Sequence, residues 1–390
     1  MVMCVRKRVT LKQVISIVKL SVLFIWFWPL PQSSSKWKVL SMKLYQYSSI
    51  LFAITVMAPM LYSVMNNLDD SNHIIKSLFA LFPCCHVIWN ILCHIVIYQQ
   101  LQFVTFEMER FCALIKSHEE ACIQREYVDK CAHFYGFCIV VFYMSLFALI
   151  LGPVVLDQPF PVTAEFPFDA SRQPLRIITY LHQVVVGLQI AAHLCVNAYM
   201  ALLLWVTSAR FRLLTEEIRA ATNIYDFIKC IKKHQQLLQY TGKVVFTVRP
   251  FALGTIMSST ISVIIFGLLL ITRGPVVLKI QCLFLASCAL LEVFMYAWPA
   301  EHLIQISSDI AQTTFEMKWY ESEHFRKNLQ MIIIRSQKPI RIVLPCGFSS
   351  LSFRYYASMA LLTLVQILPQ EFTYPDYFDI TLKELPVLRL

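Results

Sequence analysis

The stretch WYESEHFRKNLQMIIIRSQKP (residues 319–339) is a polar segment between two apolar runs, 276–300 and 342–368. Four of its apolar residues recur with helical spacing, at i, i+4, i+7 and i+8: Phe325, Leu329, Ile332 and Ile333. This spacing predicts an amphipathic α-helix with one apolar face. Pro339 predicts where the helix ends, because proline lacks a backbone N–H and clashes with the preceding turn. A polar helix between two runs of membrane-spanning length indicates a packing element outside the lipid.

The composition of the whole chain indicates a membrane protein. Of 390 residues, 57% are hydrophobic and 15% are charged, and the mean hydropathy is +0.59. A soluble protein carries about 25% charged residues. A transmembrane β-barrel shows alternating segments of about ten residues, which this sequence lacks. The sequence therefore predicts an all-α integral membrane protein with seven transmembrane helices. Their expected ranges are 40–64, 74–98, 131–156, 176–206, 244–272, 276–300 and 342–368.

The basic residues predict the orientation of these spans. With seven spans the termini lie on opposite sides, and 25 Lys and Arg fall in the N-terminal segment and the long links, against five in the other loops and the tail. The positive-inside rule then places the N-terminus in the cytoplasm and the C-terminus outside, with long cytoplasmic helical extensions. This is the reverse of a G-protein-coupled receptor. A net charge of +10 is also found in proteins that bind nucleic acid. Here the basic residues are concentrated on one side of the predicted spans, which favours a membrane protein without a nucleic-acid partner.

The chain divides into five parts by composition. The N-terminal part contains three basic residues followed by an apolar run that ends at Trp28-Pro29. A signal peptide is one interpretation, but Lys19 interrupts the run and no clear small-residue cleavage site follows. The parts are a cytoplasmic N-terminus with an amphipathic or re-entrant helix (1–39), spans one to six (40–300), a cytoplasmic polar and helical segment (301–341), span seven (342–368) and an extracellular tail (369–390).

Motifs for catalysis or cofactor binding are absent from the sequence. There is no P-loop, no HExxH and no Gly-x-Ser-x-Gly, and eight glycines are few for phosphate-binding loops. One group of residues resembles a metal cluster by type: Cys84, Cys85, His86, Cys93 and His94. Its spacing does not fit a zinc motif, so packed, reduced side chains are the preferred interpretation. The sequence predicts neither an enzyme nor a bound cofactor or metal.

Polar residues inside the spans are candidates for functional groups. Four of them lie on one face of span four: His182, Gln189, His193 and Asn197. Such a face should point to the bundle interior, either for hydrogen bonds between helices or to line a ligand cavity at its outer end. Glu292 in span six needs a partner, and Arg249 or Arg354 is the hypothesis.

Apolar and aromatic residues in the outer halves of the spans suggest a ligand cavity. Span two contributes Phe79 and Phe82, span three Phe142, Tyr143, Phe147 and Ile150, and span four Tyr180, Val184 and Leu188. Ligand cavities have mostly apolar walls and few polar anchors, so these residues are candidates to enclose a small hydrophobic molecule. Helix packing or lipid contact is the alternative for each of them.

The late polar segment resembles the signature of insect odorant receptors. The family has Trp-Tyr, then Arg-Lys, then Arg-Ser-Gln-Lys-Pro. Tyr296-Ala297-Trp298-Pro299-Ala300-Glu301, Phe166-Pro167-Phe168-Asp169 and Trp28-Pro29 are also similar to family features. The matching anchor residues here are Trp319, Tyr320, Arg326, Lys327, Arg335, Ser336, Gln337, Lys338 and Pro339.

The resemblance implies an odorant-gated, non-selective cation channel in the plasma membrane of olfactory sensory neuron dendrites. It implies a tuning subunit in a heterotetramer with a shared co-receptor, surrounded by lipid. It places a small hydrophobic odorant between the outer halves of spans two, three, four and six, which adds Phe284 to the ligand-binding candidates. The cytoplasmic segment that holds the signature is expected to anchor subunits together, and span seven is expected to line the pore. The gate candidates are Leu361, Leu364, Val365 and Leu368.

Span seven departs from the family pattern. The family ends this span with a run like Ser-Tyr-Ser-Tyr-Phe, whereas residues 357–368 are ASMALLTLVQIL and a 22-residue tail follows. The tail is expected to be an extension or the product of a non-standard transcript. Two alternatives stay open: a gustatory receptor of the same superfamily, whose span-seven signature is not evident here, and a G-protein-coupled receptor. A transporter is less favoured, because no inverted repeat is present.

Overall fold

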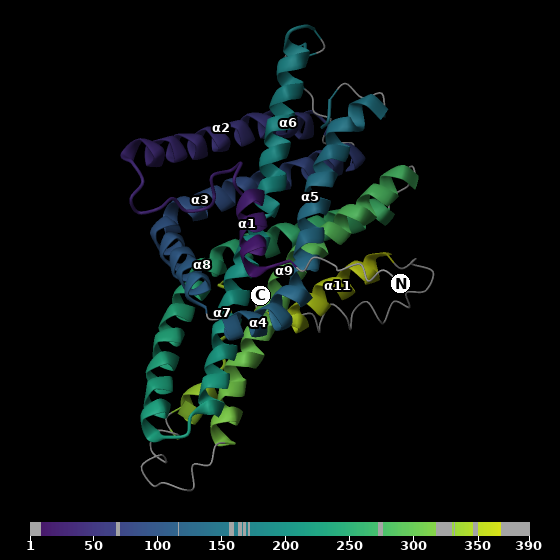
Figure 1. Ribbon diagram of the computed structural model, residues 1–390. Helices are drawn as coiled ribbons and strands as arrows, with labels where there is room; N and C mark the ends of the chain where they lie inside the picture. The colour runs from purple at the N-terminus through teal and green to yellow at the C-terminus, as the bar shows by residue number, and fades with distance from the viewer. Residues whose placement is uncertain are drawn as a thin grey trace, which may run out of the picture.

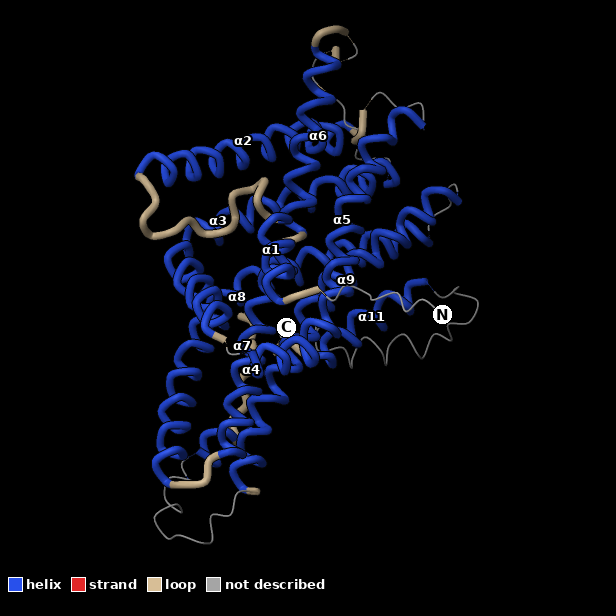
Figure 2. Tube along the Cα trace, in the orientation of Figure 1, coloured by secondary structure: helices blue, strands red, loops and turns tan. Residues whose placement is uncertain are grey.

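Long apolar runs with few glycines favour helices, and helices make up nearly all of the computed structural model. It describes residues 9–67, 71–115, 117–155, 160–162, 166, 169–170, 172–271, 276–316, 330, 332–345 and 350–367. Within these residues the only β-structure is an isolated bridge between Val343 and Ser350. The helices, blue in Figure 2, are α1 (Leu11–Ser21), α2 (Lys36–Asn66), α3 (Ser71–Leu114), α4 (Ser117–Ile123), the π-helical turn η1 (Gln124–Val128), α5 (Asp129–Val155), α6 (Leu175–Leu194), α7 (Val196–Ala220), α8 (Ile224–Ile271), α9 (Val276–Phe315) and α11 (Phe353–Ile367).

Six helical stretches in the described part of the chain have the length and hydropathy to cross a membrane. They correspond to the first six predicted spans: Lys36–Asn66, Leu81–Leu114, Ala121–Pro153, Leu175–Ala220, Ile224–Leu268 and Cys282–Phe315. Several continue well beyond the predicted limits. α3, for example, continues past the predicted end of span two at residue 98 as far as Leu114.

The seventh span begins later than predicted. α11 starts at Phe353 rather than at residue 342, and its described part has 15 residues. Pro345 explains part of the delay, because the residue before a proline is biased away from helical geometry. Ser352 then caps the helix, since its hydroxyl accepts a hydrogen bond from the backbone N–H of Tyr355 at 3.4 Å.

The centre of the molecule is α7, which packs against α8 and α9 (Figure 1). Tyr199 on α7 and Tyr296 on α9 are fully buried, and Phe251 on α8 joins them in the main hydrophobic core. The three helices run together to one end of the bundle, where residues 221–223 connect α7 to α8. We call this the link end. We call the opposite end, where residues 160–174 precede α6, the loop end.

The N-terminal segment folds back into this core. α1 begins with a capping box, in which Thr10 and Gln13 bond each other's backbone. After α1 the chain turns at Trp26, which has a positive φ of 50°. Phe27 then packs against His94 with ring centroids 4.4 Å apart, and Trp28 stacks on Tyr199 at 4.6 Å. Phe27 and Trp28 therefore fill the space between α3, α7 and α8, whereas α1 keeps exposed side chains such as Leu20.

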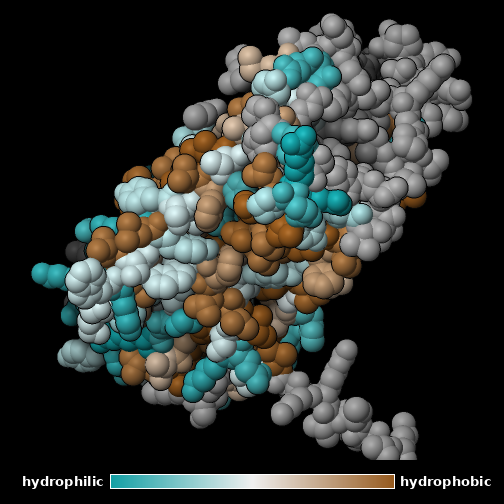
Figure 3. Space-filling view, turned by 90° about the horizontal axis from the view of Figure 1, so that it is seen from above, coloured by the Kyte–Doolittle hydropathy of each residue, from teal (hydrophilic) through white to brown (hydrophobic). Residues whose placement is uncertain are grey.

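The surface carries many apolar side chains. Figure 3 shows brown, hydrophobic residues across a broad part of one face. Val96 is 81% exposed, Leu20 68% and Phe147 59%. A soluble protein rarely exposes contiguous apolar patches of this kind, whereas a membrane protein presents them to lipid.

Candidate functional site

A small apolar cluster lies at the loop end, between three helices. Val56 and Met60 of α2, Cys84 of α3 and Val186 of α6 form a core separate from the main one. Val162, from the segment between α5 and α6, packs against it. We call this the loop-end cluster. It lies in the half of the bundle where the sequence predicts a cavity for a hydrophobic ligand.

Three polar contacts hold α6 in place around this cluster. The Tyr180 hydroxyl donates to the Ile150 carbonyl of α5 at 3.1 Å. The His182 ring and the Thr55 hydroxyl of α2 are 3.1 Å apart. The Gln183 side-chain oxygen accepts from the Val162 backbone N–H, also at 3.1 Å. Apolar walls with a few fixed polar groups are what binding sites for small molecules require.

The structure brings some predicted ligand residues together and separates others. Ile150 and Tyr180 are in contact, and the Tyr143 hydroxyl donates to the Ser21 carbonyl at 2.7 Å, so this residue holds the end of α1. Phe147 and Phe284 are exposed in the single chain. Phe142 is buried, Phe82, Val184 and Leu188 are half-buried, and the side chain of Phe79 lies outside the described residues.

A chain of polar contacts crosses the middle of the bundle. His94 bonds the Gln46 side chain of α2 at 2.7 Å and the Phe27 carbonyl at 3.0 Å. Gln189 donates to Ser49 of α2 at 3.1 Å. The Thr255 hydroxyl of α8 donates to the Asn197 side chain of α7 at 3.0 Å. Hydrogen bonding between helices, one of the two interpretations of the polar face of span four, is therefore confirmed for Gln189 and Asn197.

The hypothesis that Glu292 pairs with an arginine is wrong. Glu292 is buried, and none of the ion pairs between described residues includes it. Its carboxyl faces Ser259 and Asn197 instead. Arg249 lies ten residues before Ser259 on α8, which is about 15 Å along the helix axis. Arg354 is exposed on α11.

A second feature, which the sequence did not reveal, is a cavity of about 520 Å³ toward the link end. Its walls come from α1, from η1 and the first half of α5, and from α7. The cavity is open because small residues such as Gly136 and Ala198 line it. Val9 and Leu11, just before and at the start of α1, also form part of its wall. We call it the α1 groove. The spacing of apolar residues in a sequence shows which side chains share one face of a helix. It does not show whether the faces of two neighbouring helices leave a cavity between them.

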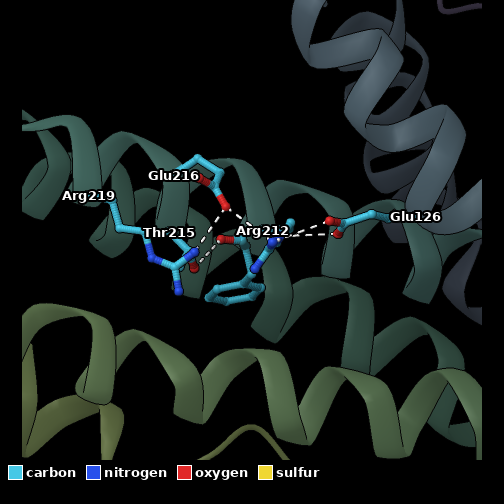
Figure 4. Close-up of polar contacts among 6 residues, drawn as sticks. Glu126, Arg212, Thr215, Glu216 and Arg219 are labelled. Atoms are coloured by element: carbon cyan, nitrogen blue, oxygen red, sulfur yellow. Dashed lines mark hydrogen bonds and ion pairs between the residues drawn. The ribbon is translucent and has the colours of Figure 1, made fainter. Parts of the chain in front are cut away.

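Charged residues gather at the link end (Figure 4). The Arg212 guanidinium of α7 contacts the Glu126 carboxylate of η1 at 3.1 Å and Glu216 at 3.2 Å. Glu216 also pairs with Arg219 at 3.1 Å. The Thr215 hydroxyl, drawn beside them, donates to the Phe211 carbonyl at 3.0 Å. This network connects the π-helical turn to the central helix.

The segment that contains the signature packs at the same end. A helical turn at 332–336 ends before Pro339, and Ile332 and Ser336 are buried. The backbone N–H of Ile340 then donates to Ser307 of α9 at 3.1 Å. Arg335 donates to the Lys338 carbonyl at 3.2 Å, while Gln337 is exposed. Four other anchor candidates, namely Trp319, Tyr320, Arg326 and Lys327, lie outside the described residues.

α11 packs against α8 and α9 through buried residues near its start. Tyr355 and Met359 are buried, and Phe294 of α9 stacks on Phe353 with ring centroids 6.0 Å apart. Of the gate candidates, Leu361 is exposed. The side chains of Leu364 and Val365, and all of Leu368, lie outside the described residues.

Comparison with known proteins decides the family. The family model "7tm Odorant receptor" matches residues 70–363, from the start of α3 into α11. The chain belongs to the insect odorant receptor family. A curated relative, "Putative odorant receptor 85d" of Drosophila melanogaster, is 22% identical over 202 residues, which span about half of each protein (49% of this chain and 49% of the relative).

Solved structures show that the odorant receptor fold extends over nearly the whole chain. The olfactory receptor OR5 of Machilis hrabei superimposes with a TM-score of 0.77 at 14% identity, over 92% of this chain and 97% of OR5. The structure of OR5 in complex with eugenol gives 0.74 at 15% identity, over 91% of this chain and 97% of OR5. This odorant receptor is therefore an all-helical, multi-pass membrane protein.

Several polar residues of this odorant receptor make hydrogen bonds between helices that the sequence did not predict. Gln46 and Ser49 of α2 and Thr255 of α8 all bond the central polar chain. The available signal was weak, because these residues form no regular polar face along their helices. Only the spatial arrangement shows that they meet His94, Gln189 and Asn197.

Proposed function

We propose that this odorant receptor is a tuning subunit that binds small, volatile, hydrophobic molecules and gates a non-selective cation channel together with a co-receptor. The observation that carries the proposal is the extent of the family match, residues 70–363. It includes α3 and α6 of the loop-end cluster and the start of α11, so much of the expected ligand side and the expected pore side belong to one family domain.

The odorant is proposed to bind at the loop end, between the halves of α3, α5, α6 and α9 that lie there. The support is chemical. The loop-end cluster is apolar, and Tyr180, His182 and Gln183 add a small number of polar groups in fixed positions. The complex of Machilis hrabei OR5 with eugenol shows that a protein of this fold holds such a molecule. The candidate residues of α3, α5, α6 and α9 remain those that the sequence predicts.

Gating is proposed to pass through α9. This helix carries Phe284 toward the loop end, and its middle contacts α11 through the stacking of Phe294 on Phe353. The Glu301 carboxylate also accepts a hydrogen bond from the Phe353 backbone N–H at 3.2 Å. An odorant that binds more tightly to one arrangement of α9 would shift the population of α11 between closed and open states. Leu361 and the residues after it are proposed to form the gate.

The orientation is proposed to be cytoplasmic at the link end. Arg210, Arg212 and Lys233 there form ion pairs with Glu107, Glu126 and Glu217. Such a concentration of charge belongs in water, and the excess of basic residues favours the cytoplasm. The anchor residues of the late polar segment are then cytoplasmic and hold subunits together. We propose the plasma membrane of the sensory dendrite as the location of the assembled channel.

The test is a current recording from cells that express this chain with and without the co-receptor. A panel of volatile odorants is applied while G proteins are blocked, and cells with the co-receptor alone serve as the control. The proposal predicts odorant-evoked cation currents that need this chain and persist under the block. Currents that disappear under the block would favour a G-protein-coupled receptor. An epitope on the N-terminus that is accessible from outside intact cells would contradict the proposed orientation.

A further inference from the structure

The α1 groove is an apolar space that the helices around it leave unfilled. α1 contributes Leu11, Val14 and Val18, α5 contributes Ala132 and Gly136, and α7 contributes Ala198 among others. A Cβ atom added at Gly136 would meet no atom of the described residues within 4 Å. The space is therefore wide enough at Gly136 to take a side chain, and the other described residues do not close it.

The mouth of the groove faces the surface that lipid covers. Phe137 and Val140 of α5 are 59% and 58% exposed, Ile17 of α1 is 47% exposed, and all three also line the groove. In a membrane protein such exposed apolar side chains contact acyl chains. The groove is thus continuous with the lipid-facing surface, so its occupant enters from the bilayer.

The length of the groove matches one leaflet. Its lining from the last residue of η1, Val128, to Val140 of α5 covers about 18 Å along the helix axis. Half of a hydrocarbon core about 30 Å thick is about 15 Å. A single acyl chain of the leaflet at the link end therefore fits the groove along its whole length.

Basic residues lie on the same turns as the link-end lining of the groove. Lys12 follows Leu11, Arg125 precedes Tyr127, and Lys130 precedes Cys131; all three basic residues are exposed and none forms an ion pair with another described residue. Two acidic groups nearby are already bonded: Asp129 accepts from Gln124 at 2.9 Å, and Glu126 pairs with Arg212. The unpaired charges beside the groove are therefore positive. This favours a lipid with an anionic head group, because basic residues at the membrane surface attract anionic lipids.

We propose that the α1 groove binds one acyl chain of an anionic phospholipid, with its head group beside Lys12, Arg125 and Lys130. The lipid would then hold α1 against α5 and α7. The inference needs membrane embedding but not odorant gating, so it stands or fails separately from the proposed function. The N-terminal residues are a poor alternative occupant, because three of the first eight are Arg6, Lys7 and Arg8.

The test uses the full-length chain, with its co-receptor, in nanodiscs that contain phosphatidylserine with a photoactivatable group on the acyl chain. After illumination, mass spectrometry locates the labelled peptides. The proposal predicts labelling within residues 9–18 and 128–140. The same probe tail on phosphatidylcholine should label at least fivefold less. Equal labelling by both lipids would overturn the anionic assignment, and labels confined to other helices would overturn the site.

Two glycines of α5 supply a matched pair of variants. Gly136→Phe fills the groove, whereas Gly152→Phe adds the same side chain at a position that is equally open but outside the groove. Labelling of the groove peptides should fall at least fivefold in G136F and stay unchanged in G152F. Unchanged labelling in a correctly folded G136F protein, judged by size-exclusion profile, would overturn the proposal.

A charge variant keeps the proposal testable if G136F does not fold. Lys12→Gln combined with Lys130→Gln should reduce the preference for phosphatidylserine over phosphatidylcholine at least threefold. No change in that preference would overturn the head-group assignment. Excess eugenol should not reduce the labelling. If eugenol abolished it, the groove would be a site for small aromatic molecules and the lipid proposal would be overturned.

Discussion

The link end and the loop end of this odorant receptor are built differently. Toward the link end, α7 packs against α8 and α9, and aromatic residues such as Phe211 and Phe227 are fully enclosed. At the loop end, the apolar cores are two small clusters, one around Val186 and one around Cys282.

This difference suggests a division of labour. A densely packed region resists local opening, and a region with few buried contacts opens at low cost. A ligand that must enter and leave needs the second kind of region. A channel whose subunits must keep their arrangement needs the first. Substitutions at the link end should therefore change mainly stability, and substitutions at the loop end should change mainly the response to ligand.

The largest expected effect is the loss of a link-end aromatic side chain. Phe211→Ala removes a fully buried ring that lies 6.5 Å from the ring of His234, centroid to centroid. Truncation of a buried Phe costs about 3–5 kcal/mol of unfolding free energy. Phe147→Ala at the loop end, where the ring is exposed, should change it by less than about 0.5 kcal/mol. Unfolding in detergent, followed by tryptophan fluorescence, measures both. Equal losses would remove the contrast between the two ends.

A smaller effect is expected where α3 and α8 approach closely. A Cβ atom added at Gly254 would collide with the Trp89 ring, whose N–H donates to the Pro250 carbonyl at 3.0 Å. Gly254→Ala should therefore destabilise the fold by about 1–3 kcal/mol through overpacking. Gly242→Ala, on the same helix but with open space around it, should stabilise the fold by about 0.5–1 kcal/mol. Thermal unfolding of the two variants compares them, and a stable G254A protein would contradict the close packing.

The charged network at the link end should contribute less than the core. Glu126→Gln breaks the contact of Glu126 with Arg212, in which both side chains are 27% exposed. We expect a loss of about 1 kcal/mol, the upper end for partly exposed pairs. Arg172, whose side chain is 83% exposed, pairs with Asp169 near the loop end, and Arg172→Gln should have no measurable effect. Raising the salt concentration should shrink the Glu126 effect. An effect that does not depend on salt would mean that packing, not charge, holds η1 to α7.

The smallest effect is expected at the buried acid between the two ends. Glu292→Gln should change the unfolding free energy by less than about 0.5 kcal/mol, the range of a substitution that breaks no specific feature. The reason is that Glu292 faces the neutral side chains of Ser259 and Asn197, which hydrogen-bond an amide as well as an acid. Glu292→Leu, which removes the polar group, is the matched control and should lower the unfolding free energy more than Glu292→Gln does. A strong loss in E292Q would point to a cation near the carboxyl.

Much of the fold followed from the sequence because length and apolar composition are enough to mark a membrane helix. The first six spans were predicted in order, and the polar face of span four does point to neighbouring helices. The signature around Arg335–Pro339 indicated the family before any comparison. These features are local or periodic, so one sequence is enough to show them.

The features that the sequence did not show depend on how separate helices meet. The partner of Glu292 depends on the rotation of α7 and α8 relative to α9, and so the arginine hypothesis failed. The α1 groove exists because small residues on α5 and α7 face α1 at the same height. Before the late start of α11, Val343 and Ser350 form a bridge between residues seven positions apart, which no local pattern indicates.

The central claim is that the loop end binds the odorant while the link end holds the channel. Its most direct test is the concentration dependence of odorant-evoked current, with the co-receptor, for Val184→Trp against Val96→Trp. Val184 is half-buried at the loop end, and Val96 is exposed on α3. We predict that V184W raises the half-maximal odorant concentration by about tenfold, equivalent to about 1.4 kcal/mol. We predict a shift of less than about twofold for V96W, since single substitutions on an exposed face are usually mild. Equal shifts in the two variants, or an unchanged response in V184W, would contradict the claim.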